Sequence, residues 1–286
     1  MNLFVAHPAL RRWLPVAPAL LILGMFVLAA LLAPWLAPAD PAAQQLLGRL
    51  KPPGSTAGHH HYLLGSDELG RDLLSRLLWG ARVSLSVALG GVLCSAVIGS
   101  LAGMLAGYLR GIVEVMVMRI ADVFLAIPAL LLAILVVAIL GPSLFNLLLV
   151  LILTRWPRYA RVAHGQTLAL AERPYVRLAS FMGAGPLRVL ARHILPNLLG
   201  PLLVVATLEF GLLVLFEAGL SFLGLGVQPP MASWGAMLSS GRNYFNAAWW
   251  VGTLPGVCLF LLVLSANRLG TALTQWLTPN TLNSQP

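Results

Sequence analysis

The stretch ERPYVRLASFMGAGPLRVLARHILPN, residues 172–197, is a polar, arginine-rich segment in a chain that is otherwise mostly apolar. Its pattern predicts two short helices. In the first helix, apolar residues at i, i+3, i+4 and i+7 form a stripe about two turns long: Tyr175, Leu178, Ala179 and Met182. Gly183 and Pro186 then interrupt it, since glycine tolerates positive φ and proline disfavours a helical residue before it. The second helix is predicted over 187–194 and should end at Pro196. By itself the pattern is typical of an amphipathic loop at the membrane surface.

Composition indicates a membrane protein with several spans. Of 286 residues, 59% are hydrophobic and 9% are charged, and the mean hydropathy is +0.87, whereas soluble domains carry about 25% charged residues. The net charge of +9 therefore concerns topology and lipid phosphates, and nucleic acid is not an expected partner. Cys94 and Cys258 lie in apolar runs and are predicted to be small buried hydrophobes. Lys51, the single lysine, follows Leu50, so the chain has no Walker A loop and ATP hydrolysis would belong to another chain.

The first span is predicted over residues 13–39, an uncharged run of 27 residues preceded by Arg11 and Arg12. A crossing needs about 20 residues, whereas a cleaved signal peptide has an apolar core of only ~7–15. A permanent span that enters from the cytoplasm is favoured, with a signal peptide as the alternative.

The longest polar segment, residues 40–82, is predicted to be extracytoplasmic. His59, His60 and His61 suggest a metal site, but adjacent side chains diverge and no carboxylate or cysteine has ligand spacing, so a solvated loop is favoured. Ser66 or Asp67 should cap a surface helix with leucines on one face: Leu69, Leu73, Leu74 and Leu77.

The second span, residues 83–109, carries a small residue at every fourth position: Gly91, Ser95, Gly99, Gly103 and Gly107. Such ladders let helix backbones approach closely in lipid. Packing within this chain is the favoured interpretation, and contact with a second subunit across a pore is the alternative.

An uncharged run of 32 residues, 123–154, would measure about 48 Å as one helix at ~1.5 Å per residue, and one span needs only ~30 Å. Gly141-Pro142-Ser143 should therefore divide it into a hairpin. Arg119 and Asp122 are expected at the inner end of the first arm, either paired or interfacial. The second arm should protrude so that three arginines reach the headgroups: Arg155, Arg158 and Arg161.

The span predicted over 198–225 contains two acids, Glu209 and Glu217. A charged group inside a membrane costs about 2.5–3.5 kcal/mol and usually faces a cavity or a partner. Eight positions place the two acids about 80° apart on a helix of ~3.6 residues per turn, so they need not share a site. Each is a candidate for structural hydrogen bonding or for lining a translocation path, and Asp122 is a third path candidate.

The last span is predicted over 245–267, with an aromatic belt at an interface: Trp234, Tyr244, Trp249 and Trp250. The fold class is an all-α membrane protein with six transmembrane helices. This arrangement places 12 of the 18 Lys and Arg residues on the side of the 172–197 segment and 6 on the other. The positive-inside bias favours both termini in the cytoplasm.

Three stretches resemble ABC-transporter permeases of the dipeptide/oligopeptide/nickel importer family. The segment 172–197 is similar to their cytoplasmic coupling loop, whose pattern is Glu-Ala-Ala, three residues, Gly, nine residues and Ile-x-Leu-Pro. Gly183 and Leu195-Pro196 match this pattern; Arg177-Leu178-Ala179 stands in place of Glu-Ala-Ala, and His193 replaces the first Ile. The stretches LGSDELGRDLLSRLLWGARVSL (64–85) and LSFLGLGVQPP (220–230) resemble this branch more closely, and the resemblance extends over about residues 14–279.

The resemblance implies a type I ABC importer permease with a cytoplasmic coupling helix. The implied partners are a second homologous permease subunit, two ATPase subunits that bind ATP and Mg, and an extracytoplasmic substrate-binding protein, assembled in the lipid of a bacterial inner membrane. This chain would itself bind no cofactor or metal and would not be an enzyme. The residues expected to contact an ATPase are Arg173, Tyr175, Val176, Arg177, Leu178, Ala179, Met182, Gly183, Ala184 and Arg188.

The implied organisation has four parts: an N-terminal tail and first span (1–39), an extracytoplasmic segment (40–82), a five-helix permease core (83–270) with the coupling loop at 164–197, and a cytoplasmic tail (271–286). In the tail, Thr271, Gln275 and Thr278 replace the charged residues that the family leads us to expect, so the tail is not a favoured ATPase contact.

The resemblance implies di- and oligopeptides as cargo, with nickel, metal chelates, glutathione or opines as alternatives. A competing class is an ion-coupled secondary carrier that uses Glu209, Glu217 or Asp122 as proton sites. A third class is a membrane-embedded docking or sensing protein without transport.

Overall fold

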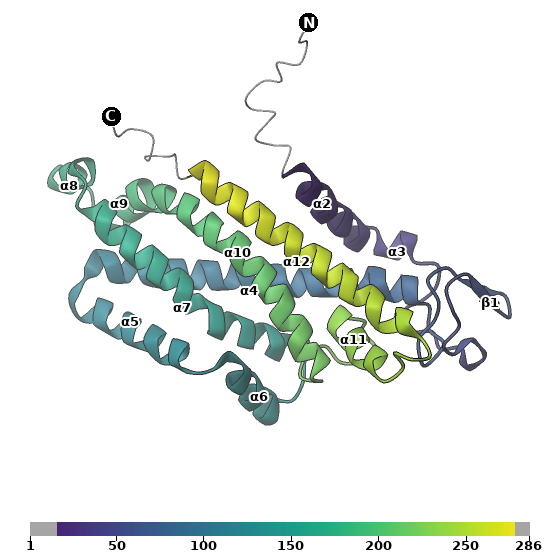
Figure 1. The fold of residues 1–286 in the computed structure, drawn as a ribbon. Helices are drawn as coiled ribbons and strands as arrows, with labels where there is room; N and C mark the ends of the chain where they lie inside the picture. Colours follow the sequence, from purple (N-terminus) through teal and green to yellow (C-terminus); the bar gives the residue numbers. More distant parts are fainter. Residues whose placement is uncertain (1–15, 278–286) are drawn as a thin grey trace, which may run out of the picture.

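The chain folds into a bundle of long helices with a small β-hairpin at one end (Figure 1). A computed structural model describes residues 16–277. Its helices are α2 (Ala17–Leu31), α3 (Ala33–Leu36), α4 (Leu73–Leu109), α5 (Gly111–Ala126), α6 (Ala129–Leu140), α7 (Leu144–Ala171), α8 (Pro174–Phe181), α9 (Pro186–Val189), α10 (Leu195–Phe222), α11 (Trp234–Arg242) and α12 (Trp249–Leu277). A 3₁₀ turn, η1 (Leu46–Gly48), and a π-helical turn, η2 (Leu190–Ile194), complete the helical elements, and β1 (Ser55–Ala57) pairs antiparallel with β2 (His60–Tyr62). The prediction of a helical protein is confirmed in its main part, and the small β-hairpin is an addition to it.

Within residues 16–277, three helical segments are long and apolar enough to cross a membrane: Leu73–Leu109, Pro186–Phe222 and Trp249–Gln275. The pair α5 and α6 counts as a fourth if its two halves form one broken span, and α2 is a shorter apolar helix. The predicted first arm of the 123–154 hairpin is wrong in detail. Its residues 123–126 belong to α5, and α6 turns away from α5 by 89°. Ile127 is extended because Pro128 disfavours a helical conformation in the residue before it.

The hairpin break after α6 is confirmed. Gly141 adopts φ +80° at the end of α6, and Ser143 caps α7 by accepting a hydrogen bond from the backbone N–H of Asn146 at 3.1 Å.

The small-residue ladder of α4 packs within the chain, against α7. A methyl group at Gly99 or Gly103 would overlap the carbonyl oxygens of Trp156 and Ala160, and Gly107 lies against Thr167. Ser95 is buried on the same face. The absence of side-chain bulk thus brings two helix backbones into direct contact, which holds α7 rigidly on α4.

The surface helix predicted to begin at Ser66 or Asp67 is not a separate element. Asp72 caps α4 by accepting from the backbone N–H of Ser75 at 2.8 Å, and α4 then runs unbroken to Leu109. Asp67 instead organises the preceding loop, where it accepts from the backbone N–H groups of Leu69 and Arg71. A short polar loop thus leads directly into the long helix.

The predicted aromatic belt is wrong for two of its four members. Trp234 is 1% exposed and donates its indole N–H to the carbonyl oxygen of Leu77 at 3.0 Å. Trp250 is 6% exposed and donates to the carbonyl oxygen of Ser66 at 3.1 Å. Trp249 is exposed, and Tyr244 is half-buried beneath the guanidinium of Arg49. Each of these two tryptophans buries its large apolar ring in the core and uses its single polar N–H to bond a backbone carbonyl of a distant segment.

Other expectations also need correction. Cys94 is exposed on the surface of the chain and is not a buried hydrophobe. Pro196 does not end a helix: it lies in the first turn of α10, where no backbone N–H is needed, and the chain continues from Pro186 to Phe222 as one apolar segment. The last helix extends past 267, so Thr271 and Gln275 are helical. Arg11, Arg12 and Thr278 lie outside the described residues.

Candidate functional site

The segment 172–197 forms a compact elbow between α7 and α10, at the opposite end of the bundle from the β-hairpin (Figure 1). Pro174 begins α8, where its missing N–H leaves no bond unmade. Gly183 ends the elbow's first helix at φ +86°, and the N–H of Ala184 bonds the carbonyl of Ala179 at 3.1 Å. A left-handed residue of this kind is a common helix C-terminal signal. The predicted helix, break and second helical piece are all present.

One side of α8 is anchored and the other is free. Val176 is 2% exposed and packs in an apolar cluster with Tyr159, Val189 and Ile194. The stripe identified from the sequence points outward instead: Tyr175, Leu178 and Met182 are exposed, and Ala179 is half-buried. The structure therefore assigns Val176 to the core and not to a contact surface.

The exposed apolar face of the elbow is larger than the stripe. Phe181 is 87% exposed and Leu187 is 80% exposed, beside Met182 at 82%. The stripe predicted from the sequence does not include Phe181 or Leu187. Phe181 directly precedes Met182 and lies at i+3 from Leu178, and this helical spacing is the signal that places it on the same face. Large apolar side chains exposed in this number on one short segment are typical of a protein-binding surface.

Arginines surround this patch, and only some are paired. The carboxylate of Glu172 forms an ion pair with the guanidinium of Arg110, at the α4–α5 junction, with an N–O distance of 2.5 Å. It also pairs with Arg177 of α8. Arg173 and Arg188 are exposed and form no ion pair among residues 16–277. The elbow therefore presents apolar side chains bordered by free positive charge.

The three path candidates lie in three different settings. Asp122 of α5 pairs with Arg161 of α7 at 2.6 Å, and both side chains are about half exposed. Glu209 pairs with Arg155 and Arg158 of α7. Arg155 is buried, so the prediction that it reaches the headgroups is wrong, whereas Arg158 and Arg161 are about half exposed.

Glu217 is completely buried and accepts a hydrogen bond from Ser221 at 2.8 Å. It lies two turns from Glu209 on α10 and shares no partner with it, as the ~80° separation predicts. The structure buries both Glu217 and Glu209 in this chain, whereas Asp122 lies at its surface.

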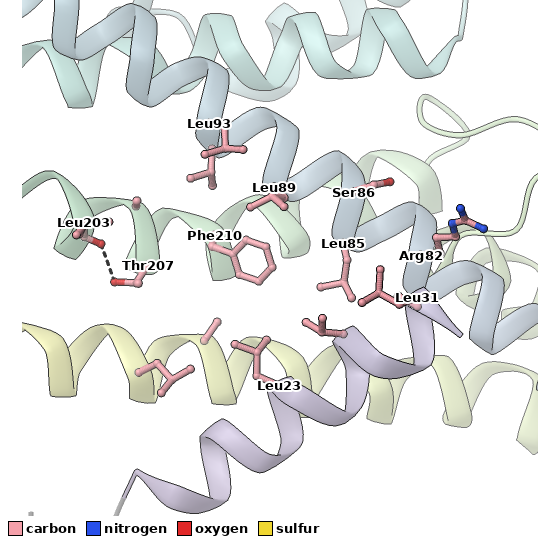
Figure 2. Close-up of a pocket in the computed structure, with 16 residues that line it drawn as sticks. Leu23, Leu31, Arg82, Leu85, Ser86, Leu89, Leu93, Leu203, Thr207 and Phe210 are labelled. Atoms are coloured by element: carbon pink, nitrogen blue, oxygen red, sulfur yellow. Dashed lines mark hydrogen bonds between the residues drawn. The ribbon is translucent and has the colours of Figure 1, made fainter. Parts of the chain in front are cut away.

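A separate groove of about 570 Å3 lies between α2, α4, α10 and α12 (Figure 2). Leucines and Phe210 line it, Arg82 stands at one end, and Thr207 at the other end donates its hydroxyl back to the carbonyl of Leu203. None of the three acidic path candidates lines this groove. Its surface suits an apolar helix or acyl chain, and it offers little to the charged ends of a peptide.

The histidine stretch forms part of the β-hairpin. His60 lies 3.6 Å from Asp72 and stacks edge-on against Tyr62, and no cluster of three metal-ligating side chains occurs within the described part of the chain. The Tyr62 hydroxyl donates to the carbonyl of Gly70 at 3.0 Å. Burial, together with the carboxylates of Asp72 and Asp67, raises the pKa of Tyr62 above its usual value, so this donor stays protonated.

Comparison with known proteins agrees with this arrangement. The model of the family "binding-protein-dependent transport system inner membrane component" matches residues 99–279, and that of the "N-terminal TM domain of oligopeptide transport permease C" matches 19–53. The di/tripeptide transport system permease protein DppC of Pseudomonas aeruginosa is 45% identical over 266 residues, which cover 93% of this chain and 88% of that protein. The dipeptide transport system permease protein DppC of Escherichia coli K12 is 44% identical over 251 residues, covering 87% and 84%.

Among solved structures, a chain of the MetNI methionine ABC transporter in an inward-facing conformation aligns with a TM-score of 0.56 at 23% identity, covering 71% of this chain and 97% of that chain. This likeness concerns the fold. The family match covers more than half of the chain, and the relatives align over most of their length. The chain therefore belongs to the binding-protein-dependent transport system inner membrane components, the permease subunits of ABC importers.

Proposed function

We propose that this chain forms half of the translocation pore of an ATP-driven importer of di- and oligopeptides in a bacterial inner membrane. The names of its relatives, which describe dipeptide and di/tripeptide transport, support this cargo. Nickel, a metal chelate, glutathione or an opine would use the same machinery as alternative cargo.

The proposed topology has six crossings with both termini in the cytoplasm. The crossings are α2 with α3, α4, α5 with α6, α7, α10 and α12. Together α2 and α3 extend over residues 17–36, about 30 Å at ~1.5 Å per residue, which suffices for one apolar layer. With this topology the elbow faces the cytoplasm and the β-hairpin faces outside, consistent with their placement at opposite ends of the bundle.

The proposed assembly contains a second, homologous permease subunit, two ATPase subunits and an extracytoplasmic substrate-binding protein. ATP and Mg would be bound by the ATPases, since the single lysine of this chain does not follow a glycine. This chain would catalyse no reaction and would hold no cofactor of its own.

The observation that carries the mechanism is the shape of the elbow. Leu178, Phe181 and Met182 are exposed on a helix whose other side is fixed by Val176. This apolar face would dock in a groove of an ATPase subunit, with Arg173 and Arg188 directed toward acidic groups at its rim. Closure of the ATPases on ATP would then displace α8.

The contacts of the elbow would transmit the displacement of α8 to the helices of the bundle. Glu172 joins α8 to the α4–α5 junction through Arg177 and Arg110, while α7 packs tightly on α4 along the glycine ladder. The elbow and the helices that flank it would therefore move together, and the pore would alternate between inward-open and outward-open states.

Co-purification from membranes in which all subunits are produced tests this function. The tagged chain is expected to retain two ATPase subunits and the second permease, and proteoliposomes of the complex should accumulate peptide only with ATP and binding protein. Uptake by the chain alone, driven by a pH gradient, would instead establish an ion-coupled carrier. Association without any uptake would indicate a docking or sensing protein.

A further inference from the structure

Two arginines of α7 converge on a single glutamate of α10. Arg158 donates from Nη1 to Oε1 of Glu209 at 2.6 Å, and Arg155 donates from Nη1 to Oε2 at 3.3 Å. Arginine remains charged in proteins, so this charged triad carries a net charge of +1. An uncompensated positive charge within an apolar bundle attracts an anion.

The triad lies near the middle of its helices. Glu209 is 14 residues from Leu195 and 13 from Phe222, the two ends of α10, which places it about 20 Å from either end at ~1.5 Å per residue. Arg158 is nevertheless 48% exposed on the surface of the chain. With the proposed topology, a guanidinium that faced hydrocarbon from the middle of these helices would cost about 2.5–3.5 kcal/mol or more, so Arg158 is expected to face a polar path.

The two guanidinium groups have unused donors, and each oxygen of the single carboxylate, that of Glu209, already accepts one hydrogen bond. The side chain of Arg155 is 11% exposed and held against the ring of Phe216 at 5.4 Å, and its buried Nε has no hydrogen-bond partner among the described residues. Arg158 commits one nitrogen to Glu209, and the rest of its planar fork remains available. Such a fork matches the two oxygens of a carboxylate.

We propose that Arg155, Arg158 and Glu209 form a binding site for the carboxylate of a substrate in transit through the pore. Glu209 holds the two guanidinium groups in place, and Arg158 contacts the passing carboxylate from the exposed side. The inference rests on the proposed function, and it narrows the cargo: peptides, glutathione and opines carry a carboxylate, whereas the net charge of the triad repels a bare nickel ion.

The test uses the complete complex of permeases and ATPases in lipid nanodiscs, without the binding protein, which would contribute its own selectivity. Saturation-transfer NMR measures binding of glycyl-leucine and of its C-terminal amide. The dipeptide is expected to bind at least tenfold more tightly than the amide. Arg158→Gln makes the triad neutral and should weaken dipeptide binding at least tenfold.

Arg119→Gln is the matched control, because Arg119 is an exposed arginine of α5 that forms no ion pair among residues 16–277. It removes the same charge and should change affinity less than twofold. Arg158→Lys keeps the charge and a partner for Glu209 but loses the fork, so the complex should assemble normally with intermediate affinity. Equal affinity for dipeptide and amide, or equal losses in Arg158→Gln and Arg119→Gln, would overturn the site.

ATP-driven uptake by the same preparation, supplied with binding protein, tests the proposed function separately. Uptake by a wild-type complex that does not bind the dipeptide directly would overturn the carboxylate site alone. Absence of both ATPase association and uptake would overturn the proposed function and this inference with it.

Discussion

The carboxylate of Glu172 at the end of α7 lies 2.5 Å from the guanidinium of Arg110, 62 residues earlier, at the junction of α4 and α5. The same carboxylate pairs with Arg177 of α8. The side chain of Glu172 thus links α8 of the elbow to the junction of α4 and α5.

Glu172→Gln should uncouple transport without unfolding the protein. Exposed ion pairs contribute about 0–1 kcal/mol each, so the melting temperature in detergent should change little. Peptide uptake per ATP hydrolysed should fall severalfold, because the elbow loses its link to the α4–α5 junction. Glu114→Gln, which removes a carboxylate of α5 that contacts His164 of α7, is the control and should retain coupling. A parallel drop in melting temperature and uptake would indicate a purely structural role.

Gly183→Asp should abolish uptake while the protein stays in the membrane. The φ of +86° at Gly183 is unfavourable by roughly 1–2 kcal/mol for other residues, although no atom lies within 4 Å of an added methyl group. Gly183→Asn should be milder, because asparagine adds no charge and is, after glycine, the residue found at left-handed helix C-termini. Gly185→Ala is the control, since Gly185 has φ −64° and also faces open space. Normal transport by Gly183→Asp would exclude α8 as the coupling element.

Glu217→Ala should lower the amount of protein in the membrane and its uptake in proportion. Glu217 is fully buried, and its loss leaves the hydroxyl of Ser221 without its acceptor, which costs about 1–3 kcal/mol. Immunoblotting of membranes beside an uptake assay measures both quantities. Reduced uptake at an unchanged amount of protein would instead place Glu217 on the translocation path.

Gly103→Ala should strongly destabilise the α4–α7 pair. The added methyl overlaps the backbone of Ala160, which cannot move aside as a flexible side chain would, and overpacking of this kind costs typically ~1–3 kcal/mol or more. Gly165→Ala in α7 meets no atom within 4 Å and should be neutral or slightly stabilising by helix propensity. Equal melting temperatures for the two variants would contradict the close backbone packing.

Much of the elbow could be predicted from its residues. The stripe of Tyr175, Leu178 and Met182, the break at Gly183 and the restart after Pro186 are local features, since helical periodicity and backbone restrictions act within a few residues. The inward direction of Val176 could not be predicted, because it depends on Val189 and Ile194, which reach it only after the chain reverses.

The ion pairs formed by the charged residues of α7, in contrast, could not be predicted from the sequence. The pattern around Arg155 and Arg158 predicted contact with headgroups, because both follow a long apolar run. Their partner, Glu209, lies more than 50 positions away, and no local signal connects them. The burial of Trp234 and Trp250 could not be predicted for the same reason. The indole N–H of Trp234 bonds the carbonyl of Leu77, and that of Trp250 bonds the carbonyl of Ser66, both far away in the sequence.

The residue pattern by itself determined that this is a mainly helical membrane protein with a glycine ladder, a bent arginine-rich elbow and two acids in an apolar run, because hydropathy and helix-breaking chemistry are local. Only the tertiary structure decided which helix the ladder meets, which acid is paired with arginine and which side of the elbow is free. Those choices depend on contacts between segments far apart in the chain, whose energies arise only when the helices pack together.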